Sequence, residues 1–192
     1  MEPEEAYAQG MAAWEKGELD TAQSLLEQAV DGAPEELKHV GNLGNLYHQR
    51  GHRAQALSCH QRASELAPNH PGAHRNQGRV LMEMGRFQEA SQALAKSLAL
   101  EPSHSECATL CAQSLASSGE FQQAWKCCEQ SIGDGAASPE LHTLYLELLF
   151  KCKELDKTLQ AAQLPDVEPA MLHRVGIGLL KLNRSVDAAQ VM

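Results

Sequence analysis

Five side chains of types that bind metal ions lie in one stretch of the chain: His104, Cys107, Cys111, Cys127 and Cys128. Two cysteines four residues apart on a helix can share a zinc ion, and a second helix can complete the site. The spacing of a zinc knuckle, two cysteines separated by two residues, does not occur. Because Cys111 and Cys128 fall where the hydrophobic pattern indicates burial, we interpret these thiols as small core groups and expect no metal site.

Histidine is the next candidate for chemistry, because the chain contains nine of them. The pattern places His60, His74 and His142 inside the fold and His48 and His173 on its surface. No serine or cysteine nucleophile with an ordered partner can be placed beside either surface histidine. The motifs HExxH and GxxxxGK(S/T) are absent, and a lone Gly-Ile-Gly tripeptide lies within an expected helix. The sequence therefore predicts no enzyme activity and no cofactor.

Composition narrows the fold class. Only 4% of the 192 residues are aromatic, and the abundant alanine, leucine, glutamine and glutamate favour helices. The net charge of −9 disfavours nucleic acids and anionic membranes as partners. No apolar run approaches the ~18 residues of a spanning helix, and the acidic N-terminus is unlike a signal peptide. We expect an all-α, cytoplasmic protein with no nucleic-acid partner and no membrane insertion.

Glycine, alanine and proline recur with a period of 34 residues, and this is the most informative pattern in the chain. Four separate series share the period. They are Gly10, Gly44 and Gly78; Gly17, Gly51, Gly85 and Gly119; Ala22, Ala56, Ala90 and Ala124; and Pro34, Pro68 and Pro102.

Each series has a physical reason when repeats are numbered from residues 3, 37, 71 and 105. Small residues at positions 8 and 20 let two antiparallel helices cross closely. Glycine at position 15 ends the first helix in a left-handed conformation, and proline at position 32 ends the second. A 34-residue helix–turn–helix unit of this kind resembles the tetratricopeptide repeat (TPR) family. The resemblance implies a right-handed superhelix of antiparallel helix pairs, an α-solenoid.

The repeats account for the chain as one TPR solenoid over residues 1–192. The fifth departs from the pattern, with Leu146, Lys153 and Thr158 at positions 8, 15 and 20, and its second helix is expected to be short because of Pro165. The repeat bounds are about 3–36, 37–70, 71–104 and 105–138, followed by a degenerate repeat at 139–168 and an incomplete one at 169–192.

In TPR proteins the first helices of successive repeats line a concave groove, and positions 2, 5, 9, 12 and 13 share that face. The first repeat offers an aromatic and adaptable patch suited to an apolar side chain. The next two offer amide, imidazole and cationic groups, whereas the later repeats are acidic. The candidate peptide-binding residues are Tyr7, Met11, Trp14, Lys38, Asn42, Asn45, His48, Arg75, Asn76 and Arg79.

Asparagines at position 6 give a more specific resemblance. Asn42 and Asn76 resemble the asparagine ladder of TPR arrays that are fused to O-GlcNAc-transferase-like enzymes. Amides at regular spacing can bond the backbone of an extended peptide without reading its sequence. Arg75 and Arg79 could hold a carboxylate beside this ladder.

The carboxylate clamp of chaperone-binding TPR domains is a second pattern for comparison. Asn45 and Asn76 match its two asparagines. Its basic residues are missing, because the corresponding positions hold Gly41, Glu106 and Leu110. We therefore do not expect a chaperone-tail clamp.

The sequence predicts a protein–protein interaction scaffold or adaptor that binds an extended peptide or partner protein of unknown identity. Two alternatives remain open. The chain stops at Met192, partway along an expected helix, so it could be the substrate-recruiting N-terminal domain of a longer enzyme of the glycosyltransferase or methyltransferase type. The last repeat also lacks a polar cap, so a second copy of the chain is a further candidate partner.

Overall fold

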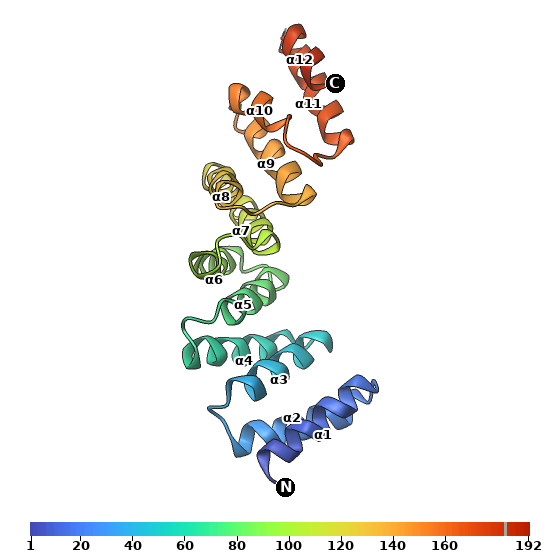
Figure 1. Ribbon diagram of the computed structural model, residues 1–192, viewed down its shortest axis with the longest axis vertical. Coiled ribbons are helices and arrows are strands. Elements are labelled where there is room, and N and C mark those ends of the chain that lie inside the picture. Colours follow the sequence, from blue (N-terminus) through green and yellow to red (C-terminus); the bar gives the residue numbers. More distant parts are fainter. Residues whose placement is uncertain (183) are drawn as a thin grey trace. The chain divides into compact units, whose positions relative to one another are not determined.

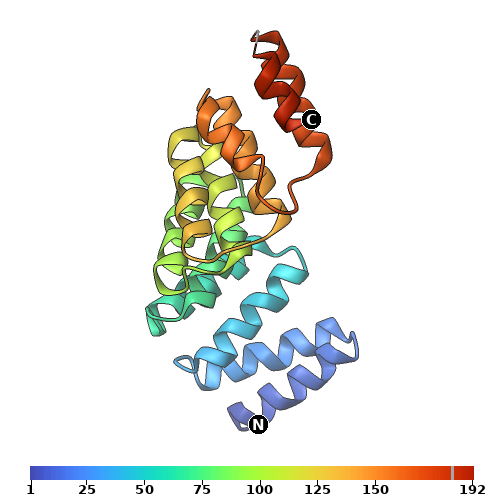
Figure 2. The same ribbon diagram turned by 45° about the horizontal axis from the view of Figure 1, so that its top comes forward.

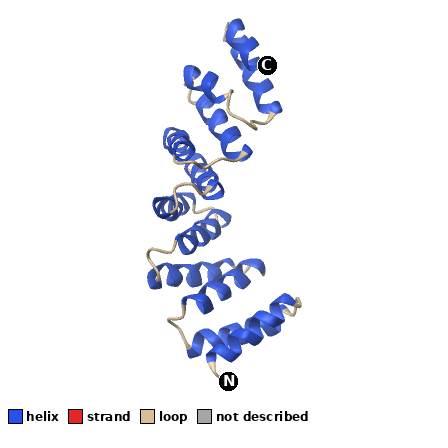
Figure 3. Cartoon of the chain, viewed as in Figure 1, coloured by secondary structure: helices blue, strands red, loops and turns tan. Residues whose placement is uncertain are grey.

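The computed structural model describes residues 1–182 and 184–192. Within those residues the chain is built from helices and connecting loops, and no strand occurs (Figure 3). The expected all-α class is confirmed. The helices group into two compact units, Met1–Leu100 and Glu101–Met192.

The first unit contains three helix pairs (Figure 1). In each pair the two helices run antiparallel and pack along their length, and α2 and α4 also pack against the first helix of the next pair. The helices are α1 (Pro3–Glu15), α2 (Leu19–Gly32), α3 (Leu37–Gln49), α4 (Arg53–Leu66), α5 (Pro71–Glu83) and α6 (Phe87–Leu100).

The described part of the second unit also contains three helix pairs (Figure 2). Its last two pairs have short second helices of seven residues each, in contrast to the 13 residues of α8. The helices are α7 (Ser105–Ser117), α8 (Phe121–Gly133), α9 (Pro139–Lys151), α10 (Leu155–Ala161), α11 (Pro169–Lys181) and α12 (Ser185–Val191). The expected shortening of the second helix in the fifth repeat is therefore present, and α10 ends four residues before Pro165.

A left-handed residue ends the first helix of each of the first five pairs. Glycine fills this place four times, with φ between 73° and 88°, and Lys153 fills it in the fifth pair with φ 62°. The next residue donates its N–H to a carbonyl five residues earlier, as Glu18 does to Ala13 at 3.0 Å. This bonding closes the exposed end of the helix, so the turn is retained where glycine is lost.

The predicted close crossing of the two helices is visible at position 8. A Cβ on Gly78 would lie 2.5 Å from Cγ of Leu94 and 3.3 Å from the carbonyl oxygen of Ala90. A Cβ on Gly44 would lie 2.8 Å from the ring of His60. No larger side chain fits there without moving the second helix, which explains the glycine series.

Three of the first helices begin with a side-chain cap that the sequence analysis missed. Ring Nδ1 of His70 accepts the backbone N–H of Ala73 at 3.3 Å, and Nδ1 of His104 accepts that of Cys107 at 3.2 Å. Oγ of Ser138 accepts from Leu141 at 3.1 Å. All three occupy position 34, so they cap α5, α7 and α9, the first helices of the following repeats.

The residues considered for chemistry are mostly core groups. His60, His74 and His142 are buried, and burial, with the nearby charges of His48 and Arg79, lowers the pKa of His60 to about 4. Cys107, Cys111 and Cys128 are buried as expected. The hydrogen bond between Cys111 and Cys127 lowers the pKa of the Cys127 thiol.

Residues 1–182 and 184–192 contain neither a cluster of metal-binding side chains nor a helix that could span a membrane. No group of three or more histidine, cysteine, aspartate or glutamate side chains has an arrangement that could hold a metal ion. None of the described helices is both long and apolar enough to cross a bilayer.

The glycine series gives a matched pair of substitutions. Gly78→Ala should destabilise the fold by about 1–2 kcal/mol, because the overpacking penalty exceeds the gain in helix propensity. Gly41→Ala, on a helix where a Cβ would meet nothing within 4 Å, should stabilise it by up to about 1 kcal/mol. Urea denaturation followed by circular dichroism measures both. Equal effects of the two substitutions would contradict the close-crossing explanation.

Candidate functional site

All ten predicted groove residues lie in the first unit, on the first helices of its three pairs. Tyr7, Met11 and Trp14 project from α1 and are half-buried against the core of this unit. Lys38, Asn42, Asn45 and His48 come from α3, and Arg75, Asn76 and Arg79 from α5. Their regular spacing follows from the repeat, because each residue stands on the same side of its own first helix.

Hydrogen bonds join α1 to α3 on this face. Nδ2 of Asn42 donates to the hydroxyl of Tyr7 at 2.6 Å, and Nε1 of Trp14 donates to the amide oxygen of Gln49 at 2.7 Å. Both aromatic side chains are thus fixed through their polar ends, while their rings stay half-exposed.

An ion pair also links the N-terminal ends of α1 and α3. Nζ of Lys38 lies 2.7 Å from Oε1 of Glu4 and 5.3 Å from the centre of the Tyr7 ring. The hydrogen bond from Lys38 lowers the pKa of the Glu4 carboxyl and raises the pKa of the Lys38 amine. Because both groups are solvated, this pair contributes more to orientation than to stability.

A series of hydrogen bonds between amide and guanidinium groups joins α3 to α5. Nδ2 of Asn76 donates to Oδ1 of Asn45 at 3.1 Å, and Nη2 of Arg79 donates to Oδ1 of Asn76 at 3.2 Å. All three residues are half-buried, as is Arg75 on the same helix. The structure therefore brings both position-6 asparagines into hydrogen bonds, each with the neighbouring first helix.

His48 and Glu83 form the last link on this face. Nε2 of His48 lies 2.6 Å from Oε1 of Glu83, and Nε of Arg53 donates to Oε2 of the same carboxylate at 3.1 Å. Burial alone would raise the pKa of Glu83, but the bonds from His48 and Arg53 lower it below its usual range.

Four of these polar contacts join residues that are about one repeat period apart, and the sequence analysis did not use this regularity. Glu4 and Lys38 are 34 residues apart, and the pairs Tyr7–Asn42, Trp14–Gln49 and His48–Glu83 are each 35 apart. A search for complementary polar residues one period apart would have found them. The polar face of α1, α3 and α5 in the first unit is thus a hydrogen-bonded ladder.

The first unit also has a cavity of about 250 Å³ between α2, α3 and α4. The hydroxyl of Tyr47 donates to Glu27 at 2.7 Å beside it, and burial raises the pKa of Cys59 in its wall to about 11. The thiol is protonated at neutral pH, so it offers no nucleophile.

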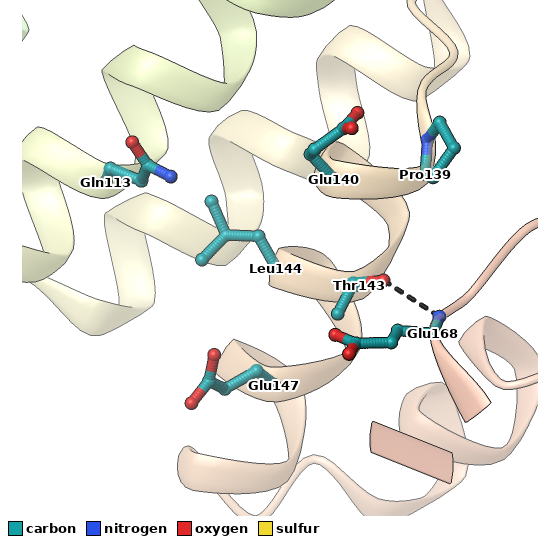
Figure 4. Close-up of a pocket in the computed structure, with 7 residues that line it drawn as sticks. All are labelled: Gln113, Pro139, Glu140, Thr143, Leu144, Glu147 and Glu168. Atoms are coloured by element: carbon teal, nitrogen blue, oxygen red, sulfur yellow. Dashed lines mark hydrogen bonds between the residues drawn. The ribbon is translucent and has the colours of Figure 1, made fainter. Parts of the chain in front are cut away.

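The second unit has a cavity of about 400 Å³ on the side of its first helices (Figure 4). The residue before α11 is held against α9 there, because the backbone N–H of Glu168 donates to Oγ1 of Thr143 at 3.0 Å. The cavity is lined by Gln113, Pro139, Glu140, Thr143, Leu144, Glu147 and Glu168. None of these was among the ten predicted residues.

Two family models match the chain, and both are described as tetratricopeptide repeat. One covers residues 43–116 and the other residues 7–71, so together they span more than half of the chain. The chain belongs to the tetratricopeptide repeat family. No curated protein sequence matches it significantly.

Solved structures support the TPR fold along the chain. MamA AMB-1 is 27% identical over 71% of this chain and 75% of its own, with a TM-score of 0.63. A second MamA structure is 16% identical over 93% and 94%, with a TM-score of 0.75. PilF of Pseudomonas aeruginosa is 20% identical over 97% and 86%, with a TM-score of 0.70. The last two are similar to this TPR chain in fold alone.

The ladder predicts a measurable coupling between the first two repeats. Tyr7→Phe and Asn42→Ala each remove one side of the same hydrogen bond, so their effects on the free energy of unfolding should be non-additive by about 0.5–1 kcal/mol. A double-mutant cycle in urea measures this coupling. Tyr7→Phe combined with Asn76→Ala is the control and should be additive. Additivity in both cycles would show that the bond between Tyr7 and Asn42 does not form in solution.

Proposed function

We propose that this TPR protein is an adaptor that binds an extended segment of a partner protein on the face formed by α1, α3 and α5. Membership of the TPR family supports a protein-interaction scaffold in general. The observation that supports this particular face is its composition, in which half-buried aromatic and thioether groups on α1 adjoin a row of amides and guanidinium groups on α3 and α5.

The α1 residues supply the apolar part of the proposed binding. Tyr7, Met11 and Trp14 leave part of their side chains at the surface while the remainder packs on the core. Rigid aromatic groups that are held in this way are frequent energetic centres of interfaces, and methionine adapts to the shape of its partner.

The polar row supplies donors and acceptors that the ladder does not consume. An asparagine amide has two N–H donors and an oxygen with two acceptor sites, so Asn42 keeps bonding capacity after donating once to Tyr7. Arg75 and Arg79 add guanidinium groups, which have several N–H donors each and bind backbone carbonyls or carboxylates well. Lys38, Asn45, His48 and Asn76 extend the row, and the extended backbone of a peptide fits such regularly spaced groups.

We place this function in the cytoplasm and propose no catalytic step, since TPR arrays of this kind are typically scaffolds. The partner is a protein rather than a nucleic acid, because the chain carries a net charge of −9.

A capture experiment tests the polar row. The substitutions Asn42→Ala, Asn76→Ala, Arg75→Ala and Arg79→Ala together should reduce the specific partners recovered from native lysate by tenfold or more, at unchanged helicity, since each bond to a charged donor contributes about 1.5–3 kcal/mol. The matched control removes two amides and two guanidinium groups elsewhere in the unit, at Gln61, Arg62, Asn69 and Arg86, all of which are exposed. Identical partner lists for the two variants would place binding on another surface.

Self-association is a second candidate function, and exposed apolar side chains at the last helix pair favour it. Leu182 and Val186 are 53% and 71% exposed. Apolar groups gathered at the end of a solenoid are the kind of surface on which a further repeat or a second copy packs.

Sedimentation velocity tests this second candidate. The apparent mass of the chain should rise with concentration, and Leu182→Lys with Val186→Lys should keep it monomeric, because burying two ammonium groups at the contact costs several kcal/mol. Met84→Lys with Leu100→Lys, at exposed apolar sites of the first unit, is the control. A chain that stays monomeric at every concentration would exclude this candidate.

A further inference from the structure

The cavity of about 400 Å³ in the second unit differs in chemistry from the polar ladder of the first. Three of its lining residues, Glu140, Glu147 and Glu168, are glutamates, and none is basic. Glu140 and Glu147 lie two turns apart on α9, and Glu168 is the residue just before α11. Figure 4 shows the Leu144 side chain reaching toward Gln113 and Glu168 held beside Thr143. A volume of this size lies within the range of about 300–1,000 Å³ of pockets that bind ligands.

A cationic side chain of the second unit pairs with one of these glutamates. Nη2 of Arg174, on α11, lies 2.7 Å from Oε1 of Glu147, and its side chain is 65% exposed. Arg174 is not one of the residues that line the cavity, so its exposed guanidinium pairs with one of the three carboxylates from outside the lining. The contact shows that Glu147 can bind a guanidinium group.

Two exposed apolar side chains lie on α11, the helix that carries Arg174. Ile177 and Leu180 are 41% and 46% exposed, and Ile177 stands one turn after Arg174 on α11. Leu144 adds an apolar side chain within the cavity itself. Exposed aliphatic groups beside carboxylates match a ligand that carries both a positive charge and an apolar side chain.

We propose that this surface is a second docking site, which binds an extended segment of a partner protein with lysine or arginine next to leucine-like residues. The basic side chain enters the cavity among Glu140, Glu147 and Glu168, and the apolar side chain lies on Leu144 and Ile177. Charge complementarity selects this occupant, because a carboxylate-bearing or neutral segment gains nothing from the three glutamates. Arg174 competes with the incoming cation for Glu147 and is displaced when the segment binds.

This site is separate from the face of α1, α3 and α5, so its test does not depend on the proposed function of that face. The probe is a fluorescein-labelled nonapeptide, Gly-Lys-Leu repeated three times, with fluorescence anisotropy as the readout. Two matched peptides replace either each lysine by glutamine or each leucine by serine. We expect the lysine–leucine peptide to bind at least tenfold more tightly than either matched peptide at low salt. Its affinity should fall as salt is raised toward physiological strength.

Variants of the full chain assign the binding to the cavity. Glu140→Gln with Glu168→Gln should weaken peptide binding about fivefold or more. Asp134→Asn with Glu154→Gln changes the charge by the same amount at exposed positions of the second unit and should have no effect. Arg174→Ala should strengthen binding about two- to fivefold, because Glu147 then has no competing cation. A gain of affinity cannot arise from loss of folding.

Three results would overturn the proposal. The glutamine peptide could bind as tightly as the lysine peptide, which would remove the need for carboxylates. Both double charge variants could weaken binding equally, which would indicate attraction to the net charge alone. Arg174→Ala could leave affinity unchanged or lower it, which would show that Glu147 does not receive the cation. None of these results would affect the capture experiment on the first unit.

Discussion

In each of the first repeats, the residue at position 8 packs closely against the second helix of the same repeat. The packing of the helix pairs and the polar contacts between first helices both depend on this contact. Gly44 and Gly78 allow α3 and α5 to approach α4 and α6 so closely that a single added carbon would collide with His60 or Leu94. This approach lets each pair bury a continuous apolar face although the chain has few aromatic residues. It also holds successive first helices in a regular register, and the polar links between α1, α3 and α5 depend on that register.

In the proposed adaptor function, the polar ladder of the first unit would have two roles that compete. Bonds such as Asn42 to Tyr7 and Asn76 to Asn45 hold the side chains in fixed positions, which lowers the entropy that a bound segment would have to remove. The same bonds occupy part of each amide, so a ligand gains only from the donors and acceptors that remain. Such a surface favours ligands whose backbone, rather than whose individual side chains, matches the spacing of the groups.

Much of the fold could be predicted from the sequence because glycine, alanine and proline act locally. Gly51 ends α3 and Pro165 follows a short α10, and both effects need only neighbouring residues. The candidate site was harder to predict, because its polar links between neighbouring first helices join residues that lie 31 to 35 positions apart. His70 and His104 as helix caps were missed since histidine is an uncommon cap. The cavity of the second unit depends on Glu168, whose place is set by a turn that the repeat pattern does not contain.

Lys153 has a wider consequence for how arrays of this kind are detected. It takes the left-handed conformation of the preceding glycines at a cost of about 1–2 kcal/mol, so the flanking helices rather than the residue type impose the turn. Repeat geometry can therefore outlast the residues that signal it. The family models stop at residue 116, whereas helix pairs continue to residue 191. Repeat counts taken from motif matches alone will underestimate the length of diverged solenoids, and the uncounted repeats are those in which new surfaces have the most freedom to evolve.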